Sequence, residues 1–296
     1  MTPKYIDIHS HVNFSAFDAD RDEVIKRALE NNTWVVNVGT QIDTSKKAIE
    51  LAHKYPEGVY ATVGLHPIHA DASFHDKQEL GPTFAKAMDR QGNEGFTSRG
   101  EVFDKNIYRE LLKDSKAVAL GECGLDYYHL DEDSIEKQKR AFVAQVELAN
   151  EVGKPLMIHI RNNYEDKGRN AYADVLEILK QHTGIKGVVH FFEGSLDDAK
   201  NFISLGFMIS FTGAITYPPR KNRKSCNYEE MVKSIPLNMI LTDTDSPYVA
   251  PIPYRGKRNE PVYVREIVKK IAEIKNLPEE EVAEAIIANA KRVFTF

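Results

Sequence analysis

The chain has 296 residues, of which 42% are hydrophobic and 28% charged, a composition typical of a globular enzyme with a core of its own. Its formal net charge of −5 excludes a strongly basic protein that coats nucleic acid, but not a nuclease with a local basic patch. The only cysteines, Cys123 and Cys226, provide no disulfide framework and favour a reducing compartment. The first residues lack the pattern of a signal peptide, and no apolar run reaches the ~20 residues of a membrane span. We therefore expect a cytoplasmic protein that is not associated with a membrane and has no obligate protein partner.

Eight short runs rich in apolar and β-branched residues are predicted to be strands. Several of them, such as VVNV and PLMIHI, are nearly continuous apolar runs, which are typical of strands covered on both faces of a parallel sheet. In chain order the predicted strands are Tyr5–His9, Trp34–Val38, Val59–Leu65, Ala117–Gly121, Pro155–His159, Gly187–His190, Gly206–Phe211 and Asn238–Asp243.

Amphipathic stretches between these runs are predicted to be helices. In the longest, Phe142, Val146 and Ala149 fall on one face. The predicted helices are Asp22–Asn31, Thr44–Tyr55, Asp133–Val152, Ala171–Gln181, Leu196–Leu205, Val262–Lys275 and Glu279–Asn289. Eight strands alternating with helices favour an α/β fold, a (β/α)8 TIM barrel, over two domains.

One long polar segment interrupts this alternation. Residues 69–107 are rich in glycine and charge, and a loop of this length inside a compact domain is usually functional or disordered. We interpret the chain as one domain, residues 1–296, with an insertion at about 69–107 after the third strand.

Histidines and carboxylates gather where the predicted strands end. His9 and His11 are two residues apart on extended chain, so both rings can face one point. The carboxyl ends of parallel barrel strands meet on the face that carries active sites. Imidazole and carboxylate groups together suit divalent metals of the Zn, Mn or Mg range. The other candidates at these ends are Glu122, His159, His190, Asp243 and Asp245.

Each candidate taken alone also has a structural explanation. His159 can be a hydrogen-bonded core side chain, Glu122 can cap a helix, and Cys123 is better explained as a small buried apolar residue than as a thiolate ligand. The joint placement of these candidates at one end of one barrel favours the metal site.

Seven motifs give the chain a resemblance that runs nearly from end to end. It resembles the TatD family of metal-dependent deoxyribonucleases, in the amidohydrolase-like barrel superfamily. The motifs are IDIHSH (Ile6–His11), VGLHP (Val63–Pro67), GECGLDYY (Gly121–Tyr128), MIHIR (Met157–Arg161), VVHFFEG (Val188–Gly194), TDTDSPY (Thr242–Tyr248) and PYRGKRNEP (Pro253–Pro261). The chain departs from the family where Asp243 replaces a usual Glu and Phe191 a usual Cys.

The resemblance implies a ligand set for two divalent ions, whether Zn, Mn, Mg or Co. It consists of His9, His11, Glu122, His159, His190 and Asp245. Two close metals neutralise a phosphodiester, lower the pKa of a bound water and stabilise the leaving oxygen. In this scheme Glu122 bridges the metals and Asp245 accepts a proton from the attacking water, so these two residues are the catalytic candidates.

Basic residues near the strand ends are candidates for binding the phosphates of a DNA substrate. Arg161 lies two residues after the MIHIR histidine, and the loop after the eighth strand carries Arg255, Lys257 and Arg258. His66 of the VGLHP motif is a further candidate, for phosphate or for another metal. The loop with Arg220, Lys221, Arg223 and Lys224 is either a phosphate site or a solvated surface, and Tyr127, Tyr128 and Tyr217 either stack on bases or pack.

The function predicted from these residues is a metal-dependent deoxyribonuclease, acting from a 3′ end or at damaged sites. Two alternatives stay open because a fold does not determine a function. One is hydrolysis of another bond, such as an aminoacyl-tRNA ester or an amide. The other is a non-catalytic binding protein on a barrel scaffold, which the complete ligand set disfavours.

Overall fold

The structure is a computed structural model. It describes residues 3–71, 74–75, 87–88, 94–97, 100–128, 132–163, 168–182, 184–218 and 226–296.

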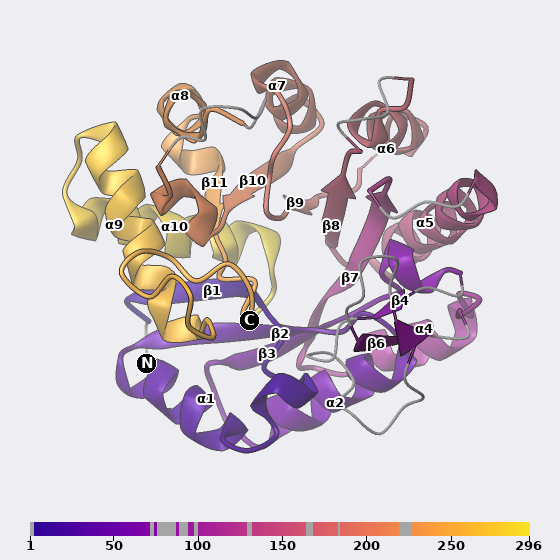
Figure 1. Cartoon of the computed structure of the whole chain (residues 1–296), viewed down its shortest axis with the longest axis horizontal. Helices are drawn as coiled ribbons and strands as arrows, with labels where there is room; N and C mark the ends of the chain where they lie inside the picture. Colours follow the sequence, from indigo (N-terminus) through magenta and orange to yellow (C-terminus); the bar gives the residue numbers. More distant parts are fainter. Residues whose placement is uncertain are drawn as a thin grey trace.

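Eight parallel strands form one sheet that curls into a nearly closed barrel, which confirms the predicted (β/α)8 TIM barrel (Figure 1). The sheet closes where Ser10 pairs with Ser246 and the His11 amide donates to the Ser246 carbonyl at 2.7 Å. In spatial order the strands are β1 (Tyr5–Ser10), β2 (Thr33–Val38), β3 (Val59–Val63), β7 (Ala117–Asp126), β8 (Leu156–Arg161), β9 (Gly187–Val189), β10 (Phe207–Phe211) and β11 (Ile240–Thr242).

Helices surround the strands, as Figure 1 shows. In the longest helix Phe142, Val146 and Ala149 are buried, as their spacing predicts, because this face covers β7. The helices are α1 (Arg21–Glu30), α2 (Ile42–His53), α4 (Lys105–Leu112), α5 (Glu132–Val152), α6 (Ala171–Lys180), α7 (Leu196–Ser204), α8 (Tyr228–Ser234), α9 (Val264–Lys275) and α10 (Glu279–Val293).

The strand predicted at Ala117–Gly121 is five residues longer in the structure. Residues 123–126 pair with residues 158–161 of β8, so β7 continues past the glycine at its predicted end. Glu122 therefore lies within β7, and His159 within β8, instead of following or ending a strand. Both residues therefore lie on backbone that is paired in the sheet, and not in a loop.

Two short helices were not predicted, and one of them begins inside the predicted insertion. The side chain of Asp104 accepts hydrogen bonds from the amides of Asn106 and Ile107 and caps α4, the barrel helix between β3 and β7. Asn227 caps α8 in the same way, through the Glu230 amide. Capping side chains at both starts were the local signal for these helices.

Part of the predicted insertion forms a small antiparallel sheet. Its strands are β4 (Phe74–His75), β6 (Glu94–Thr97) and β5 (Ala87–Met88), in that order. All other residues between 72 and 99 lie outside the described part of the chain, so the insertion at 69–107 and the single domain stay predictions.

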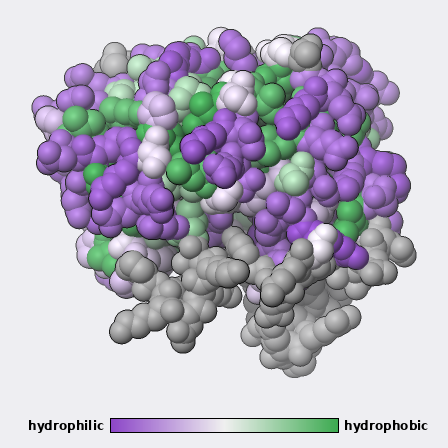
Figure 2. Space-filling view, turned by 90° about the horizontal axis from the view of Figure 1, so that it is seen from above, coloured by the Kyte–Doolittle hydropathy of each residue, from purple (hydrophilic) through white to green (hydrophobic). Residues whose placement is uncertain are grey.

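Among the described residues, no helix combines the length and apolarity needed to cross a membrane. The face drawn in Figure 2 is mainly hydrophilic, and hydrophobic side chains show between the polar ones. This mixture is normal for a protein surface in water.

Gly124 allows β7 to lie against β8 beside the barrel mouth. Its φ is +138°, and a Cβ there would lie 1.9 Å from the His159 carbonyl oxygen. We expect Gly124→Ala to lower the free energy of unfolding by about 3 kcal/mol, since a strained φ and overpacking each cost about 1–3 kcal/mol.

The matched control is Gly153→Ala. Gly153 also has a positive φ, +67°, but no described atom lies within 4 Å of the added methyl. Only backbone strain of about 1–2 kcal/mol should result. Denaturant unfolding of both variants measures the difference, and equal losses would show that β7 tolerates a side chain at Gly124.

Candidate metal centre

Seven buried or nearly buried side chains with metal-binding chemistry converge at the barrel mouth. Parallel strands place all their carboxyl ends on one rim, which brings together residues that are up to 236 positions apart in the chain. They are His9 and His11 from β1 and its end, His66 after β3, Glu122 in β7, His159 in β8, His190 after β9 and Asp245 after β11.

His9 and His11 direct one ring nitrogen each at the same point. Their Nε2 atoms are 3.1 Å apart. The Nδ1 of His11 lies 3.1 Å from the Val38 carbonyl oxygen, which can only accept a hydrogen bond, so Nδ1 carries the proton. When His11 gives up any hydrogen on Nε2, as a metal ligand must, the Nε2 lone pair is directed at the point that His9 also faces.

Asp245 faces the same two rings. Its Oδ1 lies 3.7 Å from the His9 Nε2 and 3.4 Å from the His11 Nε2. The Asp245 amide donates to the His9 carbonyl at 2.9 Å, and the preceding Thr244 donates its amide and hydroxyl to the buried Asp7 carboxylate. These bonds tie the chain after β11 to β1 and keep Asp245 at the mouth.

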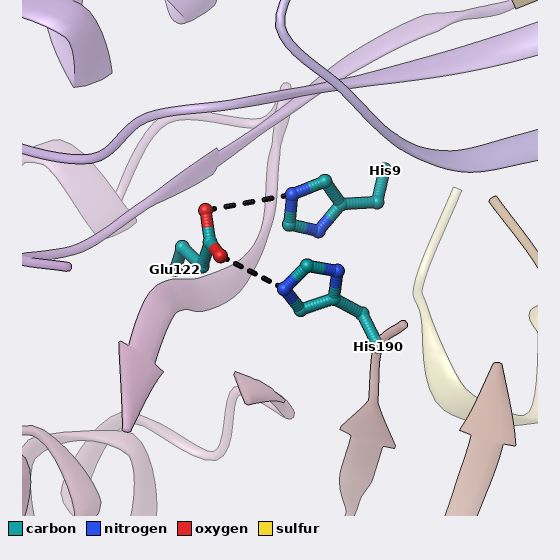
Figure 3. Close-up of side chains that lie close together, drawn as sticks. All are labelled: His9, Glu122 and His190. Carbon is teal, nitrogen blue, oxygen red and sulfur yellow. Dashed lines mark hydrogen bonds and ion pairs between the residues drawn. The ribbon is translucent and has the colours of Figure 1, made fainter. Parts of the chain in front are cut away.

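The Glu122 carboxylate faces two neighbouring imidazoles, those of His9 and His190 (Figure 3). One oxygen, Oε2, is 3.5 Å from the His9 Nε2, while the other, Oε1, is 2.8 Å from the His190 Nε2. The two oxygens therefore contact different imidazoles, and the His9 and His190 rings themselves stack with their centroids 3.7 Å apart.

Each oxygen of Glu122 also has further imidazole neighbours. Oε2 lies 3.7 Å from the His11 Nε2, whereas Oε1 lies 3.0 Å from the His159 Nδ1 and 3.3 Å from the His66 Nε2. One carboxylate thus joins two groups of nitrogen ligands.

Burial and neighbouring charge determine the protonation of these groups. Burial, assisted by His190, lowers the pKa of His9 to about 3, so His9 is neutral near pH 7 and offers a lone pair. Burial alone would raise the pKa of Glu122, but the surrounding imidazoles, His66 first, outweigh it and hold the pKa well below its usual range. The site therefore combines an anionic carboxylate with a neutral imidazole ligand.

The donor set fits a divalent metal. Three sets of described residues each offer three ligand atoms within 4.8 Å of one another: His9, Glu122 and His190; His9, His11 and Asp245; and His66, Glu122 and His159. Neutral imidazoles and carboxylates are the donors that Zn²⁺ and its neighbours prefer.

The structure brings all six predicted ligands and His66 into this cluster. Arg161 also lies at the mouth, with its guanidinium carbon 4.0 Å from the centroid of the Tyr128 ring. Cys123, as expected, is a buried small residue whose thiol lies 3.5 Å from the Met157 carbonyl oxygen.

The three basic residues after β11 differ in their surroundings. The Arg255 guanidinium lies 4.3 Å from the centroid of the Tyr217 ring, and Lys257 is exposed. Arg258 donates to both carboxylate oxygens of Asp20, at 2.8 and 2.5 Å, so its charge is paired. The predicted basic loop with Arg220, Lys221, Arg223 and Lys224 lies outside the described residues.

Sequence reasoning missed Asp126, whose carboxylate lies 3.0 Å from the His159 Nε2. The acidic residue was visible in the GECGLDYY motif, but the sequence does not show which ring it contacts. Asp243 belongs to none of the three ligand sets found among the described residues, and its Oδ2 accepts a hydrogen bond from the Ser210 hydroxyl.

The two aspartates after β11 should differ in their effect on metal binding. Asp245→Asn removes the negative charge that faces His9 and His11, whereas Asp243→Asn changes a carboxylate that is hydrogen-bonded to the Ser210 hydroxyl. We expect Asp243→Asn to weaken metal affinity by about 10–100-fold, the range for outer-shell changes, and Asp245→Asn by more. Chelator competition measures both, and a weaker effect of Asp245→Asn would contradict its assignment as a ligand.

Comparisons with known proteins agree with this centre. The family model described as TatD related DNase matches residues 6–295. The chain is 35% identical over 291 residues to the uncharacterized metal-dependent hydrolase YabD of Bacillus subtilis, covering 97% of this chain and 98% of YabD. It is 30% identical to the uncharacterized metal-dependent hydrolase MJ1582 of Methanocaldococcus jannaschii, covering 98% and 97% of the two chains. The crystal structure of YjjV, a TatD homolog from Escherichia coli, superposes with a TM-score of 0.78 at 25% identity over 99% of both chains. The chain therefore belongs to the TatD family of metal-dependent hydrolases.

Proposed function

We propose that this hydrolase cleaves phosphodiester bonds of DNA with two divalent ions bound at the barrel mouth. The observation that carries the proposal is that the two oxygens of the Glu122 carboxylate contact different imidazoles. Oε2 lies near His9, whereas Oε1 lies near His190 and His159. A carboxylate in this position can bridge two cations.

Two groups of residues would hold the ions. His9, His11 and Asp245 would hold one together with Oε2 of Glu122. His159 and His190 would hold the other with Oε1, and His66 lies close enough to contribute. When bound, the ions would neutralise the phosphate, supply a water of lowered pKa and stabilise the leaving oxygen.

Asp245 is the candidate base in this proposal. Burial alone would raise its pKa, but the neighbouring imidazoles, His11 first, outweigh burial and keep the pKa below its usual range. Asp245 is therefore anionic near pH 7, and its carboxylate can accept a proton from the attacking water.

The cations at the mouth would bind the substrate backbone. Arg161 lies over Tyr128 and Arg255 over Tyr217, and an aromatic face orients a guanidinium while its charge remains available to phosphate. Because Arg258 is already paired with Asp20, we assign more of the phosphate contact to Arg255 and Lys257.

A hydrolysis panel tests the reaction. The panel offers single-stranded, duplex and abasic DNA, RNA and an aminoacyl-tRNA as substrates. We expect the protein to cleave DNA when Zn²⁺, Mn²⁺, Co²⁺ or Mg²⁺ is added, and we expect excess chelator to stop the cleavage. Cleavage of the aminoacyl ester alone, or turnover of no substrate, would reject the proposal in favour of another hydrolase or a binding protein.

Removal of the shared carboxylate tests its role. We expect Glu122→Ala to reduce DNA hydrolysis by at least about 10³-fold, as removal of a group that acts jointly with others does, with the barrel still folded by circular dichroism. The matched control Glu110→Ala removes an exposed carboxylate on α4 that pairs with Lys113. It should leave the rate unchanged. A Glu122→Ala rate near that of this control would rule out the bridging role.

The salt dependence of binding tests the phosphate contacts. The double variant Arg255→Ala/Lys257→Ala should flatten the plot of log affinity against log salt by about 1–2 units on single-stranded DNA, because each neutralised phosphate contributes about 0.7. Fluorescence anisotropy with a hydrolysis-resistant phosphorothioate strand measures this slope. Lys270→Ala, which removes a lysine of α9 paired with Glu273, is the control. An unchanged slope in the double variant would place the phosphate path elsewhere.

A further inference from the structure

A second carboxylate of β7 touches the metal centre from the side opposite Glu122. The Nδ1 of His159 lies 3.0 Å from Oε1 of Glu122, and its Nε2 lies 3.0 Å from Oδ2 of Asp126. One imidazole ring is therefore held between two carboxylates of a single strand.

The register of β7 and β8 explains this arrangement. Gly124 pairs with His159, and alternate residues of a strand face the same side, so Glu122 and Asp126 flank the position opposite the histidine. The absence of a side chain at Gly124 lets the two backbones approach there. The spacing Glu-x-Gly-x-Asp thus places one carboxylate beside each ring nitrogen of His159.

Asp126 is itself held firmly, independently of His159. Its amide donates to the side chain of Gln138 on α5 at 2.9 Å, and the Gln138 amide group donates back to the Asp126 carbonyl at 3.0 Å. The other carboxylate oxygen, Oδ1, accepts the Tyr128 amide at 2.9 Å. Asp126 is 2% exposed, so little water competes for its remaining oxygen.

We propose that Asp126 is a positioning residue that fixes His159 with its proton on Nε2, leaving the Nδ1 lone pair for a metal beside Glu122. An ionised carboxylate can only accept hydrogen bonds, so the nitrogen facing Asp126 carries a hydrogen, and a metal bound beside Glu122 would take the place of any hydrogen on Nδ1. Histidine ligands of metals generally donate their second N–H to such a partner, which fixes ring orientation and tautomer. The inference rests on the metal centre of the proposed function, but it makes no use of the substrate.

Two substitutions separate this role from a purely structural one. Asp126→Asn keeps the size of the side chain, and its carbonyl can keep the bond to the Tyr128 amide. Its NH₂ group then faces Nε2 and donates to it, which moves the imidazole proton to Nδ1, the nitrogen needed for metal. Asp126→Ala removes the acceptor without supplying a donor, so water can still accept from Nε2–H.

The experiment is titration of the chelator-stripped protein with Zn²⁺ alone, in competition with a chelating dye. We expect Asp126→Asn to weaken the affinity of one ion by about 10–100-fold and Asp126→Ala by less. A structural role predicts the reverse order, because Asn preserves packing that Ala removes. Asp174→Asn is the matched control, since Asp174 accepts a hydrogen bond from the neighbouring Tyr127 hydroxyl, and it should bind Zn²⁺ like the unmodified protein.

A spectroscopic measurement on the unmodified chain keeps the proposal testable if a variant fails to fold. In the Zn²⁺-loaded protein, ¹⁵N NMR should show His159 protonated at Nε2. A proton on Nδ1, or a smaller effect of Asn than of Ala, would overturn the proposal. If the Zn²⁺ affinities follow the expected order and DNA is not cleaved, the role of Asp126 stands and the proposed reaction falls. If DNA is cleaved and the affinities follow the reverse order, the proposed reaction stands and the role of Asp126 falls.

Discussion

The buried carboxylate of Glu122 is the interaction on which this site depends. An ionised carboxylate buried in a protein is costly unless charged or hydrogen-bonding groups surround it. Here imidazoles from β1, β8 and the end of β9 lie within 3.5 Å of its oxygens. The carboxyl ends of several parallel strands meet at one rim and supply these partners to one anion, so the metal centre depends on the barrel.

The β7 and β8 pair carries a large share of this arrangement. Glu122 and Asp126 come from one strand, His159 comes from the other, and Gly124 between them permits the close backbone approach. A side-chain network built on paired strands is more rigid than one built on loops, because backbone hydrogen bonds determine each side chain's position. The long β7 is thus the element that sets the spacing of ligands in the site.

The sequence predicted the parts of the structure that depend on residue type and period. Apolar runs located the eight strands of the barrel. The rule that the ends of parallel strands converge predicted that His9, Glu122 and His190 lie together. It did not predict the continuation of β7 past Gly121, because that depends on pairing with β8. The contact between Asp126 and His159 was missed for a related reason: it follows from the register of two strands, which composition and period do not reveal.

An acidic chain that binds a polyanion must separate the charges that stabilise its fold from those that meet the substrate. Arg258 illustrates the first kind, since Asp20 binds both ends of its guanidinium and neutralises its charge within the protein. In the proposed reaction Arg161 and Arg255 would be of the second kind, because a tyrosine ring contacts each guanidinium without neutralising it. With a net charge of −5, general attraction to DNA is absent, so binding in the proposed reaction has to come from such local cations and from the metal centre itself. Recognition would then be concentrated at the barrel mouth, where the bond to be cleaved has to lie.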